Sequence, residues 1–253
     1  MPVEWLTPDW PAPATVRALS TLRGGGVSIG RYASLNLGEH VRDSPEAVAE
    51  NRHRLRVAAA LPAEPSWLAQ VHGVRIADLD VSPANVEAAD PTADGAVTRV
   101  PGRICAILTA DCLPVLLASE AGDAVAAAHA GWRGLAAGVI EAAVRARDVA
   151  PGALLAWLGP AIGPGHFEVG PEVRDELIRG DPGATGAFSP NARGRFMADL
   201  PGLARRRLEG VGVTRIYASG ECTHAQAGRY FSHRRDGETG RQATLVWLAP
   251  AST

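Results

Sequence analysis

Residues 104–134 read I-C-A-I-L-T-A-D-C-L-P-V-L-L-A-S-E-A-G-D-A-V-A-A-A-H-A-G-W-R-G and contain three apolar runs, at 104–108, 113–117 and 124–128. Short apolar runs between turn-forming residues are typical of strands that are buried on both faces. Alanine gives the third run the weakest β-propensity. The stretch therefore predicts three consecutive buried strands.

The segments on both sides of this stretch continue the pattern. We predict further strands at 14–23, 67–71, 74–79, 95–100, 154–158, 215–218, 229–232 and 243–248. Helices are predicted at 134–148, 171–178 and 200–208, and after a cap at Asp43 or Ser44 with Pro45 in the first turn. Because strands outnumber helices and come in runs, without a repeat or a linker, we expect one α+β domain over residues 1–253.

Composition excludes several classes of function. The net charge of −2 leaves no basic excess for a nucleic-acid partner. All basic residues other than histidine are arginine, so neither a Schiff-base lysine nor a Walker-type loop is present. We expect no membrane partner, because no apolar stretch approaches spanning length and no signal peptide is visible. Three cysteines do not form a disulfide framework, which favours a cytoplasmic location.

Three potential metal ligands, His72, Cys112 and His129, each follow an apolar run. A single histidine or cysteine in such a position is more often structural than a ligand, but the shared context favours convergence at one edge of a sheet. Two imidazoles and a thiolate suit zinc and leave a fourth position open, as in catalytic zinc sites. Cys105 lies inside the run I-C-A-I-L, so we expect it to be an inert core residue.

Other polar residues border these ligands. Asp111 precedes Cys112, and we predict that it either supports a metal-bound histidine or transfers protons; the alternative is a turn-forming role. Gln70 and Trp132 flank the two histidines, and they shape either the pocket or the packing.

A second polar cluster occurs at 221–224 (E-C-T-H) and 230–242 (Y-F-S-H-R-R-D-G-E-T-G-R-Q). Arginine forks suit phosphate, so Arg23 and Arg235 are our first and second candidates for a phosphate ligand; the alternative is a solvated hairpin with internally neutralised arginines. The turn-rich stretch 180–195 is predicted to be a long loop, which is either a mobile flap or a variable surface loop.

Nine short motifs occur together along the chain. They are T-L-R-G-G-G-V-S (21–28), Y-A-S-L-N-L-G (32–38), Q-V-H-G (70–73), A-D-G-A-V-T (93–98), T-A-D-C-L-P (109–114), H-A-G-W-R-G (129–134), L-G-P-A-I-G-P (158–164), F-E-V-G (167–170) and F-S-H-R-R-D-G-E-T-G-R-Q (231–242). In this order they resemble the YfiH-type proteins, also called the polyphenol-oxidase or laccase-domain family. The resemblance covers nearly the whole chain.

This resemblance implies that His72, Cys112 and His129 are the ligands of Zn²⁺. It also implies a single domain of layered mixed sheets with surrounding helices, similar to predicted cysteine hydrolases. The implied activity is phosphorolysis of adenosine, inosine and methylthioadenosine, with a nucleoside and phosphate as small-molecule partners, together with adenosine deamination. Asp111, Cys112 and His129 are then the candidate catalytic residues, and Arg23, Gln70 and Arg235 the candidate substrate-binding residues.

Alternative activities implied by the same family remain open. Some relatives are described as amide hydrolases that edit peptidoglycan precursors, for which Cys112 and His129 could act as nucleophile and base. Others are described as copper polyphenol oxidases, and Cu²⁺ could occupy the same ligands. Seven dispersed histidines exclude a four-copper cluster, which needs on the order of ten. Many relatives carry a cysteine pair where this chain has Gly165 and His166, so we do not expect a second thiol to function there, and the three candidate zinc ligands are unaffected.

Overall fold

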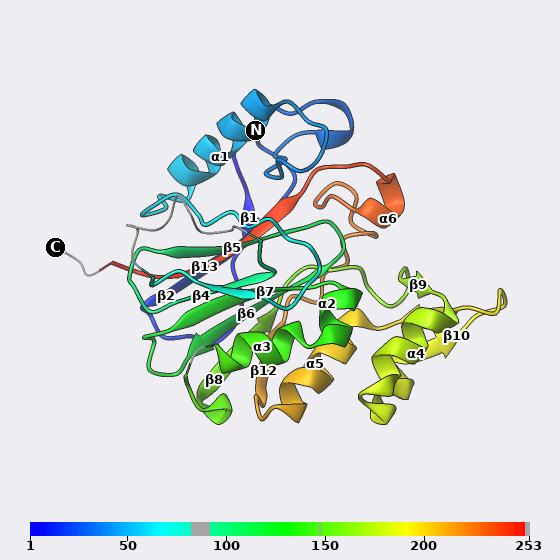
Figure 1. Ribbon diagram of the computed structural model, residues 1–253. Coiled ribbons are helices and arrows are strands. Elements are labelled where there is room, and N and C mark those ends of the chain that lie inside the picture. Colours follow the sequence, from blue (N-terminus) through cyan, green and yellow to red (C-terminus); the bar gives the residue numbers. More distant parts are fainter. Residues whose placement is uncertain (82–91, 147, 251–253) are drawn as a thin grey trace.

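The apolar stretch of residues 104–134 forms the predicted strands β5 (Ile104–Thr109), β6 (Leu113–Ser119) and β7 (Val125–Ala130), but they belong to two different sheets (Figure 1). The computed structural model describes residues 1–81, 92–146 and 148–250. In it, β5 lies in one sheet, and β6 and β7 pair in the other. The T-A-D-C turn therefore carries the chain from one sheet to the next.

Both large sheets are built around this crossing. One sheet is antiparallel in the order β1 (Trp5–Leu6), β2 (Val16–Thr21), β13 (Gln242–Leu248), β5. The other has the order β12 (Arg215–Ala218), β8 (Leu154–Leu158), β6, β7, β4 (Gly95–Thr98), β3 (Ile76–Asp78). Its outer pairs are parallel and its centre is antiparallel, so it is the expected mixed sheet.

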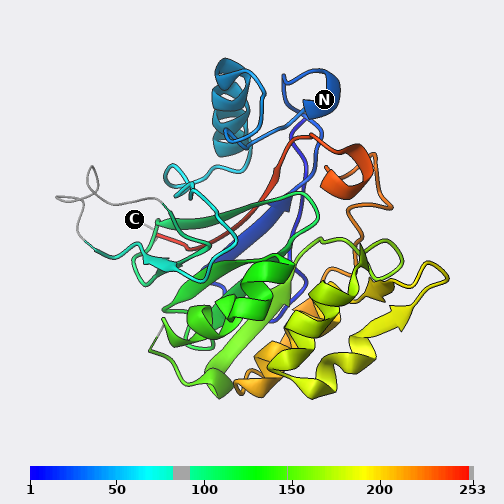
Figure 2. The same ribbon diagram turned by 45° about the vertical axis from the view of Figure 1, so that its right-hand side comes forward.

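The sheets pack face to face between two layers of helices. Alternate side chains explain why the strands are apolar throughout: Leu116 and Ala118 face the other sheet, whereas Val115 and Leu117 face the helices. Helix α1 (Pro45–Ala58) covers the four-stranded sheet, and α2 (Trp132–Ala137), α3 (Val139–Arg145), α4 (Pro171–Arg179) and α5 (Leu200–Gly210) lie together on the opposite side of the molecule (Figure 2). The result is a mixed α/β fold of four layers.

Several predicted elements are confirmed. Ser44 caps α1 by accepting a hydrogen bond from the backbone N–H of Ala47, and Pro45 begins the helix. The helix predicted at 134–148 is wrong in one respect, because Gly138 (φ +98°) divides it into α2 and α3. Its predicted end includes residue 147, which lies outside the described residues, as do 251–253 of the predicted domain.

The strands predicted at 67–71 and 229–232 are absent from the described residues. In both places a glutamine amide replaces the backbone ladder. Gln70 accepts a hydrogen bond from the N–H of Leu108 and donates one to its carbonyl, and Gln242 does the same for Phe231. These segments therefore lie beside a strand without becoming one.

The stretch 180–195 is not a long loop. It contains the 3₁₀ helix η4 (Pro182–Ala187) and β10 (Phe188–Pro190), which pairs with β11 (Phe196–Ala198), itself paired with β9 (Glu168–Val169). Ala184 and Phe188 are buried in the helix-side core, which argues against a mobile flap. No helix in the described ranges has both the length and the apolar character needed to cross a bilayer.

Candidate metal centre

The position of Cys112 and His129 follows from the strand pairing. Cys112 immediately precedes β6, in which Leu113 pairs with Ala130 and Pro114 pairs with His129 on β7. The turn before Cys112 is tight, and Asp111 adopts a positive φ of 91°. Cys112 and His129 therefore come together at the end of the six-stranded sheet where the chain crosses between the sheets.

Asp94 brings His72 to the same place. Its carboxylate accepts hydrogen bonds from the backbone N–H groups of Val71, His72 and Gly73 at 3.1, 2.8 and 2.6 Å. Asp94 precedes β4, which pairs with β7, so its backbone carbonyl also accepts a hydrogen bond from the N–H of His129. One buried carboxylate therefore holds the loop of His72, which has a φ of 63°, against the strand of His129.

The three side chains face one another at distances that suit a metal ion. Their ligand atoms lie within 4.8 Å of each other, and Cys112 Sγ is 3.8 Å from His72 Nε2. Tetrahedral zinc with usual bond lengths separates sulfur from nitrogen by about 3.5 Å. A Cβ at Gly131 would lie 2.9 Å from both Cys112 Sγ and His72 Cδ2, so a glycine is required there. His129 is buried and His72 is exposed, so the site is open on one side.

Electrostatics favour a thiolate in this cluster. Burial by itself raises the pKa of Cys112, but the positive charge of His129 and hydrogen bonds from His129 and His72 outweigh it and lower the pKa to about 6. Burial lowers the pKa of His129, and the negative charge of Cys112 and the hydrogen bond to Asp94 raise it to about 9. Without a metal, Cys112 is therefore a thiolate beside a protonated His129, and binding of zinc, which takes neutral imidazole, would release the proton of His129.

The carboxylate beside a histidine of the cluster is Asp94, not Asp111. Asp94 Oδ1 lies 2.9 Å from His129 Nδ1, and it leaves Nε2 to face the cluster. Burial raises the pKa of Asp94, but hydrogen bonds from His129, Gly73 and Val71 lower it to about 2. Asp111 instead accepts hydrogen bonds from Thr223 Oγ1 at 2.7 Å and the N–H of Arg234 at 2.6 Å, so it fixes the turn.

The structure directs the predicted substrate-binding side chains to internal partners. Both ends of the Gln70 amide bond Leu108. Arg23 donates to the carbonyls of Ala33 and Ala227 and stacks on Phe231. These contacts hold backbone segments together, and in the Arg23 guanidinium only Nη2 has no acceptor among the described residues.

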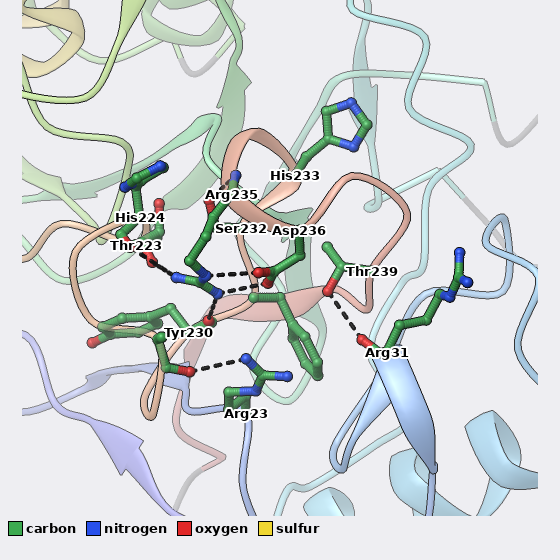
Figure 3. A network of polar contacts seen from close by, with 12 residues as sticks. Arg23, Arg31, Thr223, His224, Tyr230, Ser232, His233, Arg235, Asp236 and Thr239 are labelled. Carbon is green, nitrogen blue, oxygen red and sulfur yellow. Dashed lines mark hydrogen bonds and ion pairs between the residues drawn. The ribbon is translucent and has the colours of Figure 1, made fainter.

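Arg235 is the centre of the network drawn in Figure 3. It lies on the short helix α6 (His233–Asp236), so the predicted hairpin is absent there. Its guanidinium donates to the carbonyls of Thr223, His224 and Tyr230 and forms a two-bond ion pair with Asp236. Every donor group of this fork has a partner inside the protein.

Residues outside the predicted set also lie near the cluster. Burial lowers the pKa of His40, and the positive charges of Arg241, His129 and Arg52 lower it further. Sequence reasoning missed both His40 and Asp94. For Asp94 a signal existed, because A-D-G precedes a predicted strand just as T-A-D-C does. Cys105 is fully buried between the sheets, as expected, and Trp132 packs against the helix-side core.

Comparison with known proteins agrees with the fold and the motifs. The family model described as "Multi-copper polyphenol oxidoreductase laccase" matches residues 17–249. The chain is 54% identical over 245 residues to a purine nucleoside phosphorylase of Pseudomonas aeruginosa, covering 96% of this chain and 98% of that protein. It is 49% identical over 243 residues to the purine nucleoside phosphorylase YfiH of Escherichia coli, with coverage of 96% and 98%.

Solved structures show the same architecture. The crystal structure of a Neisseria meningitidis protein matches with a TM-score of 0.91 and 47% identity, covering 97% of this chain and 99% of that one. The crystal structure of YlmD from Geobacillus stearothermophilus matches with a TM-score of 0.89 and 33% identity, with coverage of 97% and 96%. The chain therefore belongs to the laccase-domain family of the YfiH type.

Proposed function

We propose that this chain is a zinc-dependent purine nucleoside phosphorylase that acts on adenosine, inosine and methylthioadenosine and also deaminates adenosine. The observation that carries the proposal is the name "purine nucleoside phosphorylase" of relatives 54% and 49% identical over almost their full lengths. The proximity of His72, Cys112 and His129 supports it, because their donor atoms match those of catalytic zinc.

Phosphorolysis makes specific demands on such a site. A phosphate oxygen forms a bond to C1′ of the ribose while the C1′–N9 bond breaks, and the purine leaves with the electron pair. A bound zinc ion would supply positive charge for an oxyanion or for the leaving base. His72, Cys112 and His129 would hold it, and Asp94 would keep the ring of His129 oriented.

Deamination requires only water as the second reactant, so the substrate pocket need not bind phosphate. The oxygen of a water molecule forms a bond to C6 of adenine, and the C6–N bond breaks to release ammonia. Asp111 was a candidate for the proton transfers, but its two hydrogen bonds to Thr223 and Arg234 favour a positioning role. We therefore propose that Asp111 fixes the position of Cys112.

Two observations bear on alternative chemistry. Within the described ranges, the potential metal ligands form one such group, with two histidines, and this argues against a four-copper oxidase despite the family's name. In contrast, Cys112, His129 and Asp94 resemble the nucleophile, base and orienting acid of cysteine hydrolases. Amide hydrolysis of a peptidoglycan precursor by Cys112 is therefore the second candidate.

One assay separates these activities. The purified zinc-loaded protein is incubated with adenosine in the presence and absence of inorganic phosphate, and the products are resolved. Adenine and ribose 1-phosphate formed only with phosphate support the phosphorylase, and inosine with ammonia supports the deaminase. Absence of both, together with cleavage of a muramyl-peptide precursor by the metal-free protein, contradicts the proposal and supports the hydrolase.

A further inference from the structure

Arg241 lies beside the turn that carries Cys112. It directly precedes β13, whose first residue, Gln242, pairs with Thr109 at the end of β5. The next residues of that chain are Ala110, Asp111 and the metal ligand itself. The backbone of Arg241 is therefore fixed by the sheet next to the crossing turn.

A buried asparagine fixes a second segment against Arg241. Asn36 Oδ1 accepts hydrogen bonds from the N–H groups of both Gly38 and Arg241, at 3.0 and 2.9 Å, and Arg241 O accepts one from the N–H of Leu37. A Cβ at Gly38 would lie 2.8 Å from Arg241 Cγ and 3.3 Å from His40 Cε1. The absence of a side chain at Gly38 therefore allows the Arg241 stem and the His40 ring to lie close together.

The guanidinium of Arg241 presents one edge without a protein partner. Its Nη1 donates to the carbonyls of Thr239 and Gly240, but no described residue accepts a hydrogen bond from Nε or Nη2. Elsewhere in the protein, Arg206 and Arg235 use these same two nitrogens to bind the carboxylates of Asp181 and Asp236. The Nε–Nη2 edge is the geometry that binds carboxylate or phosphate through two parallel hydrogen bonds.

The charge around this edge is positive and only partly compensated. Burial lowers the pKa of Arg241, and the negative charges of Cys112 and Asp111 partly offset this. Neither Arg241 nor His40 forms an ion pair with any residue in the described part of the chain. Burial and the neighbouring positive charges lower the pKa of His40, so its ring is a neutral hydrogen-bond donor, and Arg241 supplies the positive charge for an anion.

We propose that Arg241 and His40 form the binding site for inorganic phosphate next to the metal ligands. Arg241 binds two phosphate oxygens through Nε and Nη2, and His40 donates to a third from the other side of Gly38. This inference deepens the proposed phosphorolysis and rests on it. It replaces Arg23 and Arg235, whose guanidinium groups are engaged by backbone carbonyls.

The test uses the zinc-loaded protein in two measurements. The first is the KM for phosphate in nucleoside cleavage, and the second is binding of inorganic phosphate alone by calorimetry. We expect Arg241→Gln to weaken phosphate by about 10- to 100-fold in both measurements, the range for a lost charge-assisted fork, with little change in the nucleoside KM. His40→Asn should weaken it by roughly 3- to 10-fold, and Arg241→Lys should fall between wild type and Arg241→Gln.

One control and a second test variant separate a local from a structural effect. Arg31→Gln removes an arginine that pairs with Glu238 at the surface, and it should leave phosphate binding unchanged. His40→Asn should fold normally, because no hydrogen bond from the His40 ring is present among the described residues, so a loss of phosphate binding in it would be local. Unchanged phosphate KM and phosphate binding in both Arg241→Gln and His40→Asn would overturn the inference. Arg241-dependent phosphate binding without any nucleoside cleavage would contradict the proposed function alone.

Discussion

The candidate metal centre and the network around Arg235 are both dense in charged and ring side chains, yet they differ in where the polar atoms find partners. In the α6 network, the guanidinium of Arg235 bonds three backbone carbonyls and Asp236 (Figure 3). In the candidate metal centre, His72 and Cys112 face each other. Asp94 forms the hydrogen bonds that position the backbone of His72 and the ring of His129. The difference shows that donors with partners inside the protein hold the fold together, whereas side chains that face one another without such partners can bind a ligand.

The largest expected effect is the loss of a metal ligand. Cys112→Ala removes the thiolate, and we expect zinc affinity to fall by more than about 100-fold, because loss of an outer partner alone costs about 10- to 100-fold. Phosphorolysis and deamination should be lost together. Zinc content after dialysis measures the effect, and Cys222→Ser is the matched control because its thiol lies outside the cluster. Full activity of a folded, zinc-free Cys112→Ala protein would disprove a metal-centred reaction.

Substitutions of the two aspartates near the site should have clearly different effects on zinc affinity. Asp94→Asn preserves shape but weakens the hydrogen bond that orients His129, so we expect zinc affinity to fall by about 10- to 100-fold. Asp111→Asn weakens the turn that positions Cys112, through Thr223 and Arg234, but it removes no partner of the cluster side chains, so we expect a smaller fall in zinc affinity, of about threefold. Competition with a chelator of known affinity measures both. Equal losses in the two variants would show that the turn and the His129 partner matter alike.

Arg235 should behave as part of the fold. Arg235→Gln removes hydrogen bonds to three carbonyls and the ion pair with Asp236, so we expect the free energy of unfolding to fall by about 2–3 kcal/mol. The phosphate KM of the folded variant should stay within about twofold of wild type, which is under about 0.4 kcal/mol. Urea titration and kinetics below the transition measure the two quantities. If the variant were stable but its phosphate KM greatly raised, Arg235 would instead be a substrate-binding residue.

Much of this arrangement could be predicted from the sequence. The runs at 104–108 and 113–117 indicate buried strands because their apolar side chains have no polar face to expose. Residue type and context also predict that His72, Cys112 and His129 come together, which the structure confirms. The sequence does not contain the register that places Asp94 opposite His129, so the choice between Asp94 and Asp111 required the pairing of β4 with β7. Adjacency to Cys112 was the misleading signal.

Two failed strand predictions have one physical cause. The run 67–71 and the run 229–232 are apolar and lie against a sheet, but one glutamine side chain joins each run to the neighbouring strand. Gln70 bonds the backbone of Leu108 on β5, and Gln242 on β13 bonds the backbone of Phe231. Hydrophobic periodicity detects burial, and it does not show whether a backbone or an amide side chain supplies the partners. Gly138 divides the predicted helix for a similar reason, since the apolar pattern continues through its left-handed conformation.

Arg23 gives the smallest expected effect and the sharpest test of this distinction. Its guanidinium bonds the carbonyls of Ala33 and Ala227 and stacks on Phe231, which are fewer contacts than Arg235 makes. We therefore expect Arg23→Gln to lower the free energy of unfolding by about 1–2 kcal/mol. Zinc affinity and phosphate KM should not change, and Arg31→Gln at the surface provides the control for charge. If Arg23→Gln left stability intact but raised the phosphate KM tenfold, internal hydrogen bonds would no longer distinguish structural arginines from those that bind substrate.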